Sequence, residues 1–339
     1  MVSDHKGSSD IMRIGILGLG NLGSSIGRLI ANNGHDVLAW EYDQQVVDEV
    51  NRKHCNSRFL AGVQLPVNLI ATADINQLAS LDSLVITMPS PFIVKTLTSF
   101  SNPIASSTSL INLSKGISAE GKTIYQTLTQ LAPNNPIALL SGPTIANEVA
   151  KDKLTAIVAA STSDVLLNQI ELLFSSEYFS VSRHHDPIAV ELGGILKNIY
   201  ALAMGIVVSH DAYGQNFNGA FIYLALKEMA SLIAALGGES QASYGLSGLG
   251  DLITTALSED SHNRHMGTLL ATGLSVEEIK QQLVVLPEGY NSLYQALKLA
   301  EAHGCPLPLA MIIKQRVEGV INSDGLMKGI SLLLKTERC

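Results

Sequence analysis

The feature that most constrains the fold of this chain is a glycine pattern between a predicted strand and a predicted helix. Residues 12–17 form a short apolar run typical of a β-strand, and Gly18-Leu19-Gly20-Asn21-Leu22-Gly23 follows at once. Residues 24–33 have a helical composition and stop at Gly34, a residue typical of helix C-termini. In this setting the GxGxxG pattern predicts a dinucleotide-binding unit. A glycine turn that holds no ligand is the simpler alternative.

Each glycine of the pattern has a physical role in such a unit. Gly18 allows the tight turn, Gly20 lets the backbone approach a pyrophosphate, and Gly23 lets the helix pack closely on the strand. The helix N-terminus would meet the negative pyrophosphate with free N–H groups and a favourable dipole.

The acidic residue after the second predicted strand bears on the choice of cofactor. That strand covers residues 36–40, and Glu41 follows it, about 20 residues beyond the glycines, where a carboxylate accepts hydrogen bonds from ribose hydroxyls. A carboxylate would repel the 2′-phosphate of NADP, and residues 41–45 contain no Arg or Lys. NAD is therefore favoured over NADP. Asp43 is the alternative to Glu41 if the register differs.

Further apolar runs follow at the spacing of a doubly wound sheet. Residues 84–88, 109–113 and 137–140 each end in small or polar residues, and residues 155–160 and 178–181 complete the set. The carboxyl ends of parallel strands are where ligands bind in such sheets. The predicted fold class is therefore α/β plus all-α: a Rossmann-type doubly wound sheet followed by a helical domain.

The texture of the sequence changes after Asp186-Pro187. The predicted helices of the second half cover residues 188–208, 219–236, 264–271, 275–284, 290–303 and 308–321, with no convincing strand among them. We therefore expect a disordered N-terminus at residues 1–11, a dinucleotide-binding domain at 12–187 and a helical substrate domain at 188–339.

The segment ELGGILKN, residues 191–198, opens the helical half and contains a single lysine, Lys197. Apolar residues cover most of the circumference of this predicted helix, so Lys197 is expected in packed surroundings. Burial lowers the pKa of a lysine, which would let it exchange a proton with a substrate oxygen. The alternative is a lysine that reaches the surface from a buried helix.

A glycine-rich turn farther along, residues 245–250, ends on Asp251 and is followed by Thr255 and by Ser261-His262-Asn263-Arg264. This mixture predicts the polar wall of a pocket. Asp251 as a simple helix cap is the alternative.

Composition excludes several classes of function. Of the 339 residues, 46% are hydrophobic and 15% charged, which indicates a compact globular protein, and the net charge of -8 argues against a nucleic-acid binder. Cys55, Cys305 and Cys339 form neither a zinc pattern nor a disulfide framework, which fits a reducing cytoplasm. No metal site, signal peptide or membrane span is predicted.

The ordered motifs resemble those of the NAD(P)-dependent glycerol-3-phosphate dehydrogenase family. They are GxGxxG, SKGI at 114–117, SGPTIANEVA at 141–150, ELGGILKN, GLSGLGDLITT at 245–255, SHNR at 261–264 and PEG at 287–289. The resemblance implies a Rossmann domain with a helical domain, and hydride transfer between dihydroxyacetone phosphate and sn-glycerol 3-phosphate. A small-molecule substrate is implied, with no nucleic-acid or membrane partner, and a homodimer is a possible assembly.

The resemblance also assigns roles to residues. Lys197 matches the catalytic lysine. The predicted substrate-binding residues are Lys115, Gly142, Thr144, Asn198, Asp251, Thr255, Ser261, His262 and Asn263. The predicted cofactor-binding residues are Gly18, Gly20, Asn21, Leu22, Gly23, Glu41, Tyr42, Pro89, Lys115, Ala146, His262, Leu286 and Glu288.

Four positions depart from the family pattern. His262 replaces an arginine that serves the substrate phosphate, and Tyr223-Leu224 stands where the family has another arginine. Tyr42 replaces an arginine of bacterial members, and Leu22 replaces a tryptophan of the glycine loop. The predicted chemical step is thus intact, whereas phosphate recognition is altered. A dehydrogenase for another small hydroxy compound and an inactive cofactor-binding paralogue are the alternatives.

Overall fold

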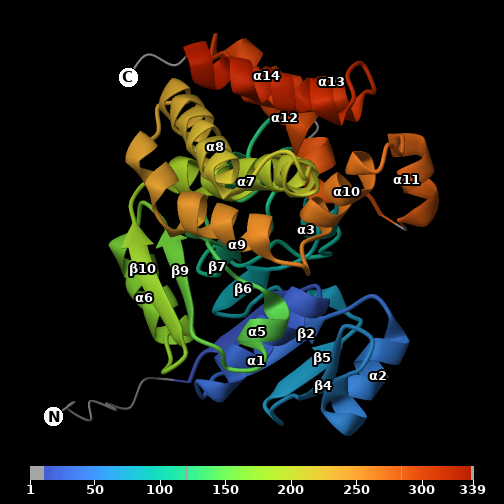
Figure 1. Ribbon diagram of the computed structural model, residues 1–339. Coiled ribbons are helices and arrows are strands. Elements are labelled where there is room, and N and C mark those ends of the chain that lie inside the picture. Colours follow the sequence, from blue (N-terminus) through green and yellow to red (C-terminus); the bar gives the residue numbers. More distant parts are fainter. Residues whose placement is uncertain (1–10, 119–120, 284, 337–339) are drawn as a thin grey trace, which may run out of the picture.

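The computed structural model describes residues 11–118, 121–283 and 285–336, which form an α/β part and a helical part (Figure 1). The predicted disordered segment, apart from Ile11, and Cys339 lie outside the described residues. The strands are β1 (Arg13–Leu17), β2 (Asp36–Trp40), β3 (Cys55–Asn56), β4 (Leu60–Gln64), β5 (Leu69–Thr72), β6 (Ser83–Ile86), β7 (Ser109–Asn112), β8 (Ile137–Ser141), β9 (Thr155–Ala160) and β10 (Phe179–His184). The helices of the α/β part are α1 (Asn21–Asn32), α2 (Gln44–Lys53), α3 (Ile93–Leu97), α4 (Ile124–Leu131), α5 (Ala146–Val149) and α6 (Asp164–Phe174).

An eight-stranded sheet forms the centre of the α/β part, in the order β10-β9-β8-β7-β6-β1-β2-β5. The six strands from β5 to β8 are parallel to one another. This is the doubly wound order that the sequence predicts, with its switch point between β1 and β6. β9 is antiparallel to β8, contrary to the expected parallel sheet. The connection between them contains only the four-residue α5, not a full crossover helix.

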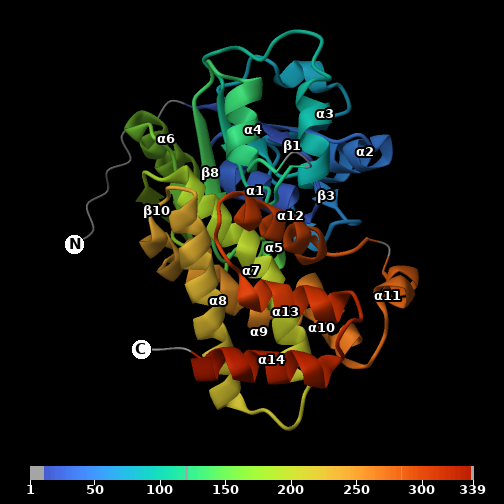
Figure 2. The ribbon, with the colours of Figure 1, turned by 90° about the horizontal axis from the view of Figure 1, so that it is seen from above.

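Helices cover both faces of this sheet. The apolar sides of α1, α2 and α6 pack on one face and those of α3 and α4 on the other (Figure 2). β6, β7 and β8 are buried along their whole length, which explains why their sequences are continuously apolar and do not alternate. The loops after β1 and β7 and the last residue of β8 reach the helical part, so they can contribute to one site.

The helical part is built around one buried helix. Its elements are α7 (Pro187–Val208), α8 (Gln215–Ala235), α9 (Asp251–Leu257), α10 (His262–Ala271), α11 (Val276–Gln282), α12 (Glu288–Ala302), α13 (Pro308–Val317) and α14 (Ser323–Thr336). α7 lies at the centre, with α8, α9, α10 and α12 packed around it (Figures 1 and 2). α7 and α8 are long and apolar enough to cross a membrane, but the apolar window of α7 is completely buried inside the protein. A helix that is apolar all round is a core helix in such a setting.

Most predicted elements of this half are confirmed to within a few residues. α9 and α14 were not predicted. A glycine-rich turn precedes α9, whereas α14 has an ordinary N-cap: Asn322 Oδ1 accepts a hydrogen bond from the backbone N–H of Gly325 at 2.9 Å. In the α/β part, the short strands β3, β4 and β5 were also missed; β5 is four residues long and begins directly after Pro66-Val67-Asn68.

α7 is fastened to the α/β part by a buried carboxylate. Glu191, near the start of α7, accepts hydrogen bonds from the backbone N–H of Tyr125 at the head of α4, at 3.1 and 3.2 Å. Burial raises its pKa to about 7, although hydrogen bonds from Thr123 and the α4 backbone oppose this. The contact fixes the direction in which α7 leaves the sheet.

α7 and α10 cross with their backbones in contact. A Cβ atom at Gly205 of α7 would lie 2.1 Å from the carbonyl oxygen of Arg264, and one at Gly267 of α10 would lie 2.0 Å from that of Leu202. These two glycines bring the first turn of α10 close to the helix that contains Lys197.

We expect Gly205→Ala to destabilise the protein, because a methyl group at the crossing must push the two helices apart. The free energy of unfolding should fall by about 1–3 kcal/mol, as for other overpacked cores. Gly219→Ala in α8 is the matched control, since a Cβ there meets nothing within 4 Å. It should raise stability by about 0.5–1 kcal/mol. Chemical denaturation of both variants measures the difference, and equal effects would contradict the packing argument.

Candidate active site

Two lysines and one carboxylate meet where the two parts of the chain touch. The Nζ atom of Lys197, in the middle of α7, donates hydrogen bonds to Asp251 Oδ1 at 2.8 Å and to Thr255 Oγ1 at 2.5 Å. Lys115, in the loop after β7, donates to the other carboxylate oxygen of Asp251. Lys197 is 7% exposed and Asp251 2%, so the lysine does not reach the surface and the prediction of packed surroundings is confirmed.

Burial and charge act against each other in this cluster. Burial lowers the pKa of Lys197 to about 8, because the ammonium loses hydration; Asp251 opposes this and the charge of Lys115 adds to it. Burial alone would raise the pKa of Asp251, but the two ammonium groups hold it below its ordinary value. A carboxylate that stays ionised between two lysines leaves one net positive charge in the site.

Two consecutive glycines let α7 enter this crowded position. A Cβ atom at Gly193 would lie 3.0 Å from the carbonyl oxygen of Ser247, and one at Gly194 would lie 2.4 Å from Ser141 Oγ and 3.4 Å from Lys115 Cε. The GG pair of ELGGILKN is therefore a packing feature. It places Lys197, one helical turn later, opposite Lys115.

The residues after Lys197 belong to an amide network. Asn198 accepts a hydrogen bond from Asn263 Nδ2 at 3.0 Å and donates one to Glu288 at 3.4 Å. Asn263 Oδ1 accepts from the backbone N–H of Gly289 at 2.8 Å. The network joins α7, α10 and α12. The buried side chain of Asn263 links the three helices. The backbone N–H of the same residue belongs to the first turn of α10.

A cleft of about 550 Å³ lies between the two parts of the chain, next to Thr255 and therefore close to Lys197. Asn21 and Ala146 line it from the α/β part, and Thr255, Ser261 and His262 line it from the helical part. The sequence predicted all five as site residues but could not predict that they share one cleft. Six further lining residues were missed: Ile145, Asn147, Ser258, Glu259, Asp260 and His265.

The first turn of α10 faces this cleft. Ser261 is the N-cap, and its Oγ accepts a hydrogen bond from the backbone N–H of Arg264 at 3.2 Å. The N–H groups of His262 and Asn263 have no intrahelical acceptor in such a turn and can bind an anion. The side chain of His262 is exposed.

The glycine loop fits a pyrophosphate in three respects. Gly18 has a φ of 98°, which favours glycine, and a Cβ at Gly23 would collide with the Gly18 carbonyl oxygen at 1.9 Å. A Cβ at Gly20 meets nothing within 4 Å, so this glycine borders open space. Asn21 Oδ1, at the start of α1, is buried without a hydrogen-bond partner among the described residues. An orphaned polar atom beside open space suits a site that a ligand completes.

The acidic residue Glu41 is turned toward the loop. It is 5% exposed. Its two carboxylate oxygens accept hydrogen bonds from the backbone N–H groups of Leu19 and Asp43, both at 3.2 Å. Glu41 thus holds the loop in shape, while Asp43 and the exposed Tyr42 lie farther out.

The remaining predicted residues surround the same region. Lys115 and Gly142 follow β7 and β8; Gly142 has a φ of 133° and its carbonyl oxygen accepts a hydrogen bond from Thr144 Oγ1 at 3.1 Å. Pro89 is exposed after β6, Leu22 is half-buried in α1, and Leu286 is half-buried just before α12. No cluster of metal-ligating side chains occurs among the described residues.

Comparison with known proteins agrees with this architecture. Family models for the N-terminus and the C-terminus of NAD-dependent glycerol-3-phosphate dehydrogenase match residues 13–166 and 186–328. Glycerol-3-phosphate dehydrogenase [NAD(P)+] of Lysinibacillus sphaericus is 33% identical over 324 residues, covering 93% of this chain and 96% of the relative. The enzyme of the same name from Clostridium perfringens is 32% identical over 330 residues, covering 96% and 98%.

A solved structure agrees as well. The crystal structure of glycerol-3-phosphate dehydrogenase from Coxiella burnetii superposes with a TM-score of 0.88 at 29% identity, covering 96% of this chain and 99% of that one. Because both halves match in one order over nearly the whole length, the chain belongs to the NAD-dependent glycerol-3-phosphate dehydrogenase family.

Proposed function

We propose that the protein interconverts dihydroxyacetone phosphate and sn-glycerol 3-phosphate with a nicotinamide dinucleotide as cofactor. The observation that carries the proposal is the shared cleft. It is lined by Asn21 and Ala146 of the dinucleotide-binding part and by Thr255, which is hydrogen-bonded to the buried Lys197. Family membership supplies the substrate, because the relatives are named for it.

The chemistry assigns distinct roles to the two lysines. The nicotinamide of the bound cofactor supplies or accepts the hydride. As the ketone is reduced, the ammonium of Lys197 donates a proton to the substrate oxygen; in the oxidation direction the neutral amine takes the hydroxyl proton. Asp251 and Thr255 orient its Nζ atom. Lys115 adds a positive charge that stabilises negative charge developing on the oxygen.

The substrate phosphate would lie at the N-terminus of α10. There the backbone N–H groups of His262 and Asn263 and the helix dipole favour an anion. The imidazole of His262 stands where the family has an arginine, whose guanidinium carries a permanent charge and can bind a phosphate with two hydrogen bonds.

One observation favours a second candidate, a dehydrogenase for an unphosphorylated small hydroxy compound. The carboxylates of Glu259 and Asp260 line the same cleft as His262. They would repel a phosphate dianion unless histidine is charged.

For the cofactor, the glycine loop with Asn21 would hold the pyrophosphate. We propose NAD as the preferred form, because the end of β2 carries Glu41, Tyr42 and Asp43 and no basic residue in that stretch. The proposed compartment is the cytoplasm, since widely spaced cysteines suit reducing conditions.

Replacement of Lys197 tests the acid–base role. We expect Lys197→Met to lower the turnover number by about 10²-fold or more, because the group assigned as general acid and base is lost. Cofactor affinity, measured by titration, should stay unchanged. Lys328→Met, at an exposed position of α14, is the control and should keep full activity. Unimpaired turnover in Lys197→Met would rule out the assigned role.

The pKa of Lys197 predicts opposite pH dependences for the two directions. With a pKa of about 8, the ammonium needed for ketone reduction is lost as the pH rises through that value. The amine needed for alcohol oxidation is gained over the same range. kcat/KM should therefore fall above about pH 8 for reduction and fall below about pH 8 for oxidation. Profiles that run in the same direction would contradict Lys197 as the titrating group.

His262→Arg tests phosphate recognition. A permanent charge should lower the KM for dihydroxyacetone phosphate, with a gain approaching the 1.5–3 kcal/mol of a charged hydrogen bond. Dihydroxyacetone, which lacks the phosphate, is the matched substrate control, and His303→Arg at the end of α12 is the control variant. If neither wild type nor His262→Arg prefers the phosphorylated ketone, the second candidate function replaces the first.

A further inference from the structure

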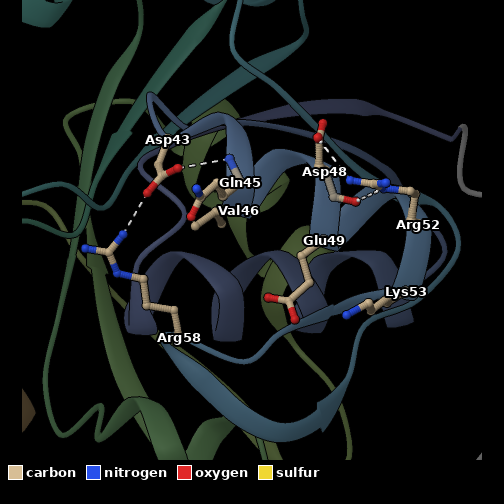
Figure 3. Close-up of a pocket in the computed structure, with 8 residues that line it drawn as sticks. All are labelled: Asp43, Gln45, Val46, Asp48, Glu49, Arg52, Lys53 and Arg58. Atoms are coloured by element: carbon tan, nitrogen blue, oxygen red, sulfur yellow. Dashed lines mark hydrogen bonds and ion pairs between the residues drawn. The ribbon is translucent and has the colours of Figure 1, made fainter.

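A salt bridge beside the end of β2 carries the inference. Asp43 is the N-cap of α2: its Oδ1 accepts a hydrogen bond from the backbone N–H of Gln45 at 2.9 Å. Its Oδ2 lies 2.7 Å from Nη1 of Arg58, in the turn between β3 and β4. The guanidinium also lies over the ring of Phe59, 5.0 Å from the centroid. Figure 3 shows the pair on the wall of a cavity of about 490 Å³ beside α2.

The location of the Asp43–Arg58 pair, beside the carboxyl end of β2, indicates which ligand group it would contact. In dinucleotide-binding folds the adenosine ribose lies at the carboxyl end of the second strand, where an acidic residue binds the 2′-hydroxyl or an arginine binds a 2′-phosphate. Glu41 is buried against the glycine loop, so Asp43 is the carboxylate left at that end. Arg58 is distant in sequence, yet the fold brings its charge to the same place. Residues 41–45 contain no basic residue, but Arg58 brings a positive charge to the end of β2.

We propose that the Asp43–Arg58 pair sets the choice between NAD(H) and NADP(H). The carboxylate of Asp43 accepts a hydrogen bond from the 2′-hydroxyl of NAD(H), and the guanidinium of Arg58 binds the 2′-phosphate of NADP(H). This rests on the proposed function, which supplies a nicotinamide dinucleotide as the ligand. NAD(H) remains the preferred form, and Arg58 is what allows the same subsite to accept NADP(H).

The exposure of the pair allows such a switch. The side chains of Arg58 and Asp43 are 56% and 25% exposed, and exposed ion pairs contribute little to stability, so a phosphate can take over the arginine. Among the described residues no hydrogen bond engages Nε or Nη2 of Arg58, which leaves a fork of donors for phosphate oxygens. The neighbouring Arg52 is instead paired with Asp48, 3.0 Å away on the same helix.

The experiment measures the dissociation constants of NADH and NADPH for the full chain. Trp40, the only tryptophan, ends β2 and serves as a fluorescent probe beside the site. We expect Arg58→Ala to raise the Kd of NADPH at least about tenfold, the effect of losing a charged hydrogen bond, and to change that of NADH less than about twofold. Asp43→Asn keeps the helix cap, because asparagine caps as well as aspartate. It should tighten NADPH and weaken NADH, each about threefold or more.

Arg183→Ala, which breaks the exposed ion pair of Arg183 on β10 with Glu171, is the matched control and should leave both constants unchanged. Equal effects of Arg58→Ala on the two cofactors, or no effect on NADPH, would overturn the assignment of Arg58. Unchanged selectivity in Asp43→Asn would overturn that of Asp43. In those cases wild type still binds a dinucleotide and the proposed function survives. Failure of wild type to bind either cofactor would instead overturn the proposed function and this inference together. Melting temperatures of the variants, compared with wild type, show that each one folds.

Discussion

The buried contact of Asp251 with two lysines is the interaction on which the site depends. Burying one unpaired charge would cost several kcal/mol, so Lys115 and Lys197 can be held away from water only because one carboxylate serves both. The positive charge is not fully neutralised, because two ammonium groups share one carboxylate. The remaining positive charge lies in low-dielectric surroundings, where it acts strongly on a substrate oxygen. The same surroundings bring the pKa of Lys197 close to the range in which a lysine can both give and take a proton.

This contact also explains how the two parts of the chain are joined. Lys115 belongs to a loop of the sheet, Lys197 to the central helix and Asp251 to α9, so the charges come together only in the assembled protein. Two features hold α7 at the required place. Glu191 ties its first turn to α4, and the Gly193–Gly194 pair lets its backbone approach the sheet. The buried position of α7 therefore has two consequences: it forms the core of the helical part, and it places Lys197 beside Asp251.

Much of this could be predicted from the sequence, because the features concerned are local. The glycine loop, the range of β2 and the burial of Lys197 follow from patterns within a few residues of one another. What could not be predicted depends on contacts between distant segments. Nothing near Glu41 shows that its carboxylate turns back to the glycine loop, and nothing near Asp43 shows that Arg58 will lie beside it. Local patterns likewise do not predict the antiparallel direction of β9 or the amide network around Asn263, because both depend on contacts between distant segments.

The residues at the two ends of the cleft differ in burial: Lys197 and Asp251 at the chemical end are buried, whereas His262 at the phosphate end is exposed. At the chemical end, Lys197 and Asp251 are enclosed, and replacement of Asp251 would leave two ammonium groups without their shared carboxylate. At the phosphate end, His262 is exposed on the first turn of α10, while the next residue, Asn263, carries the hydrogen bonds that hold the turn in place. A change at position 262 therefore alters the charge presented to the ligand without disturbing the helix. Substrate affinity can vary at that position while the proton-transfer machinery stays the same.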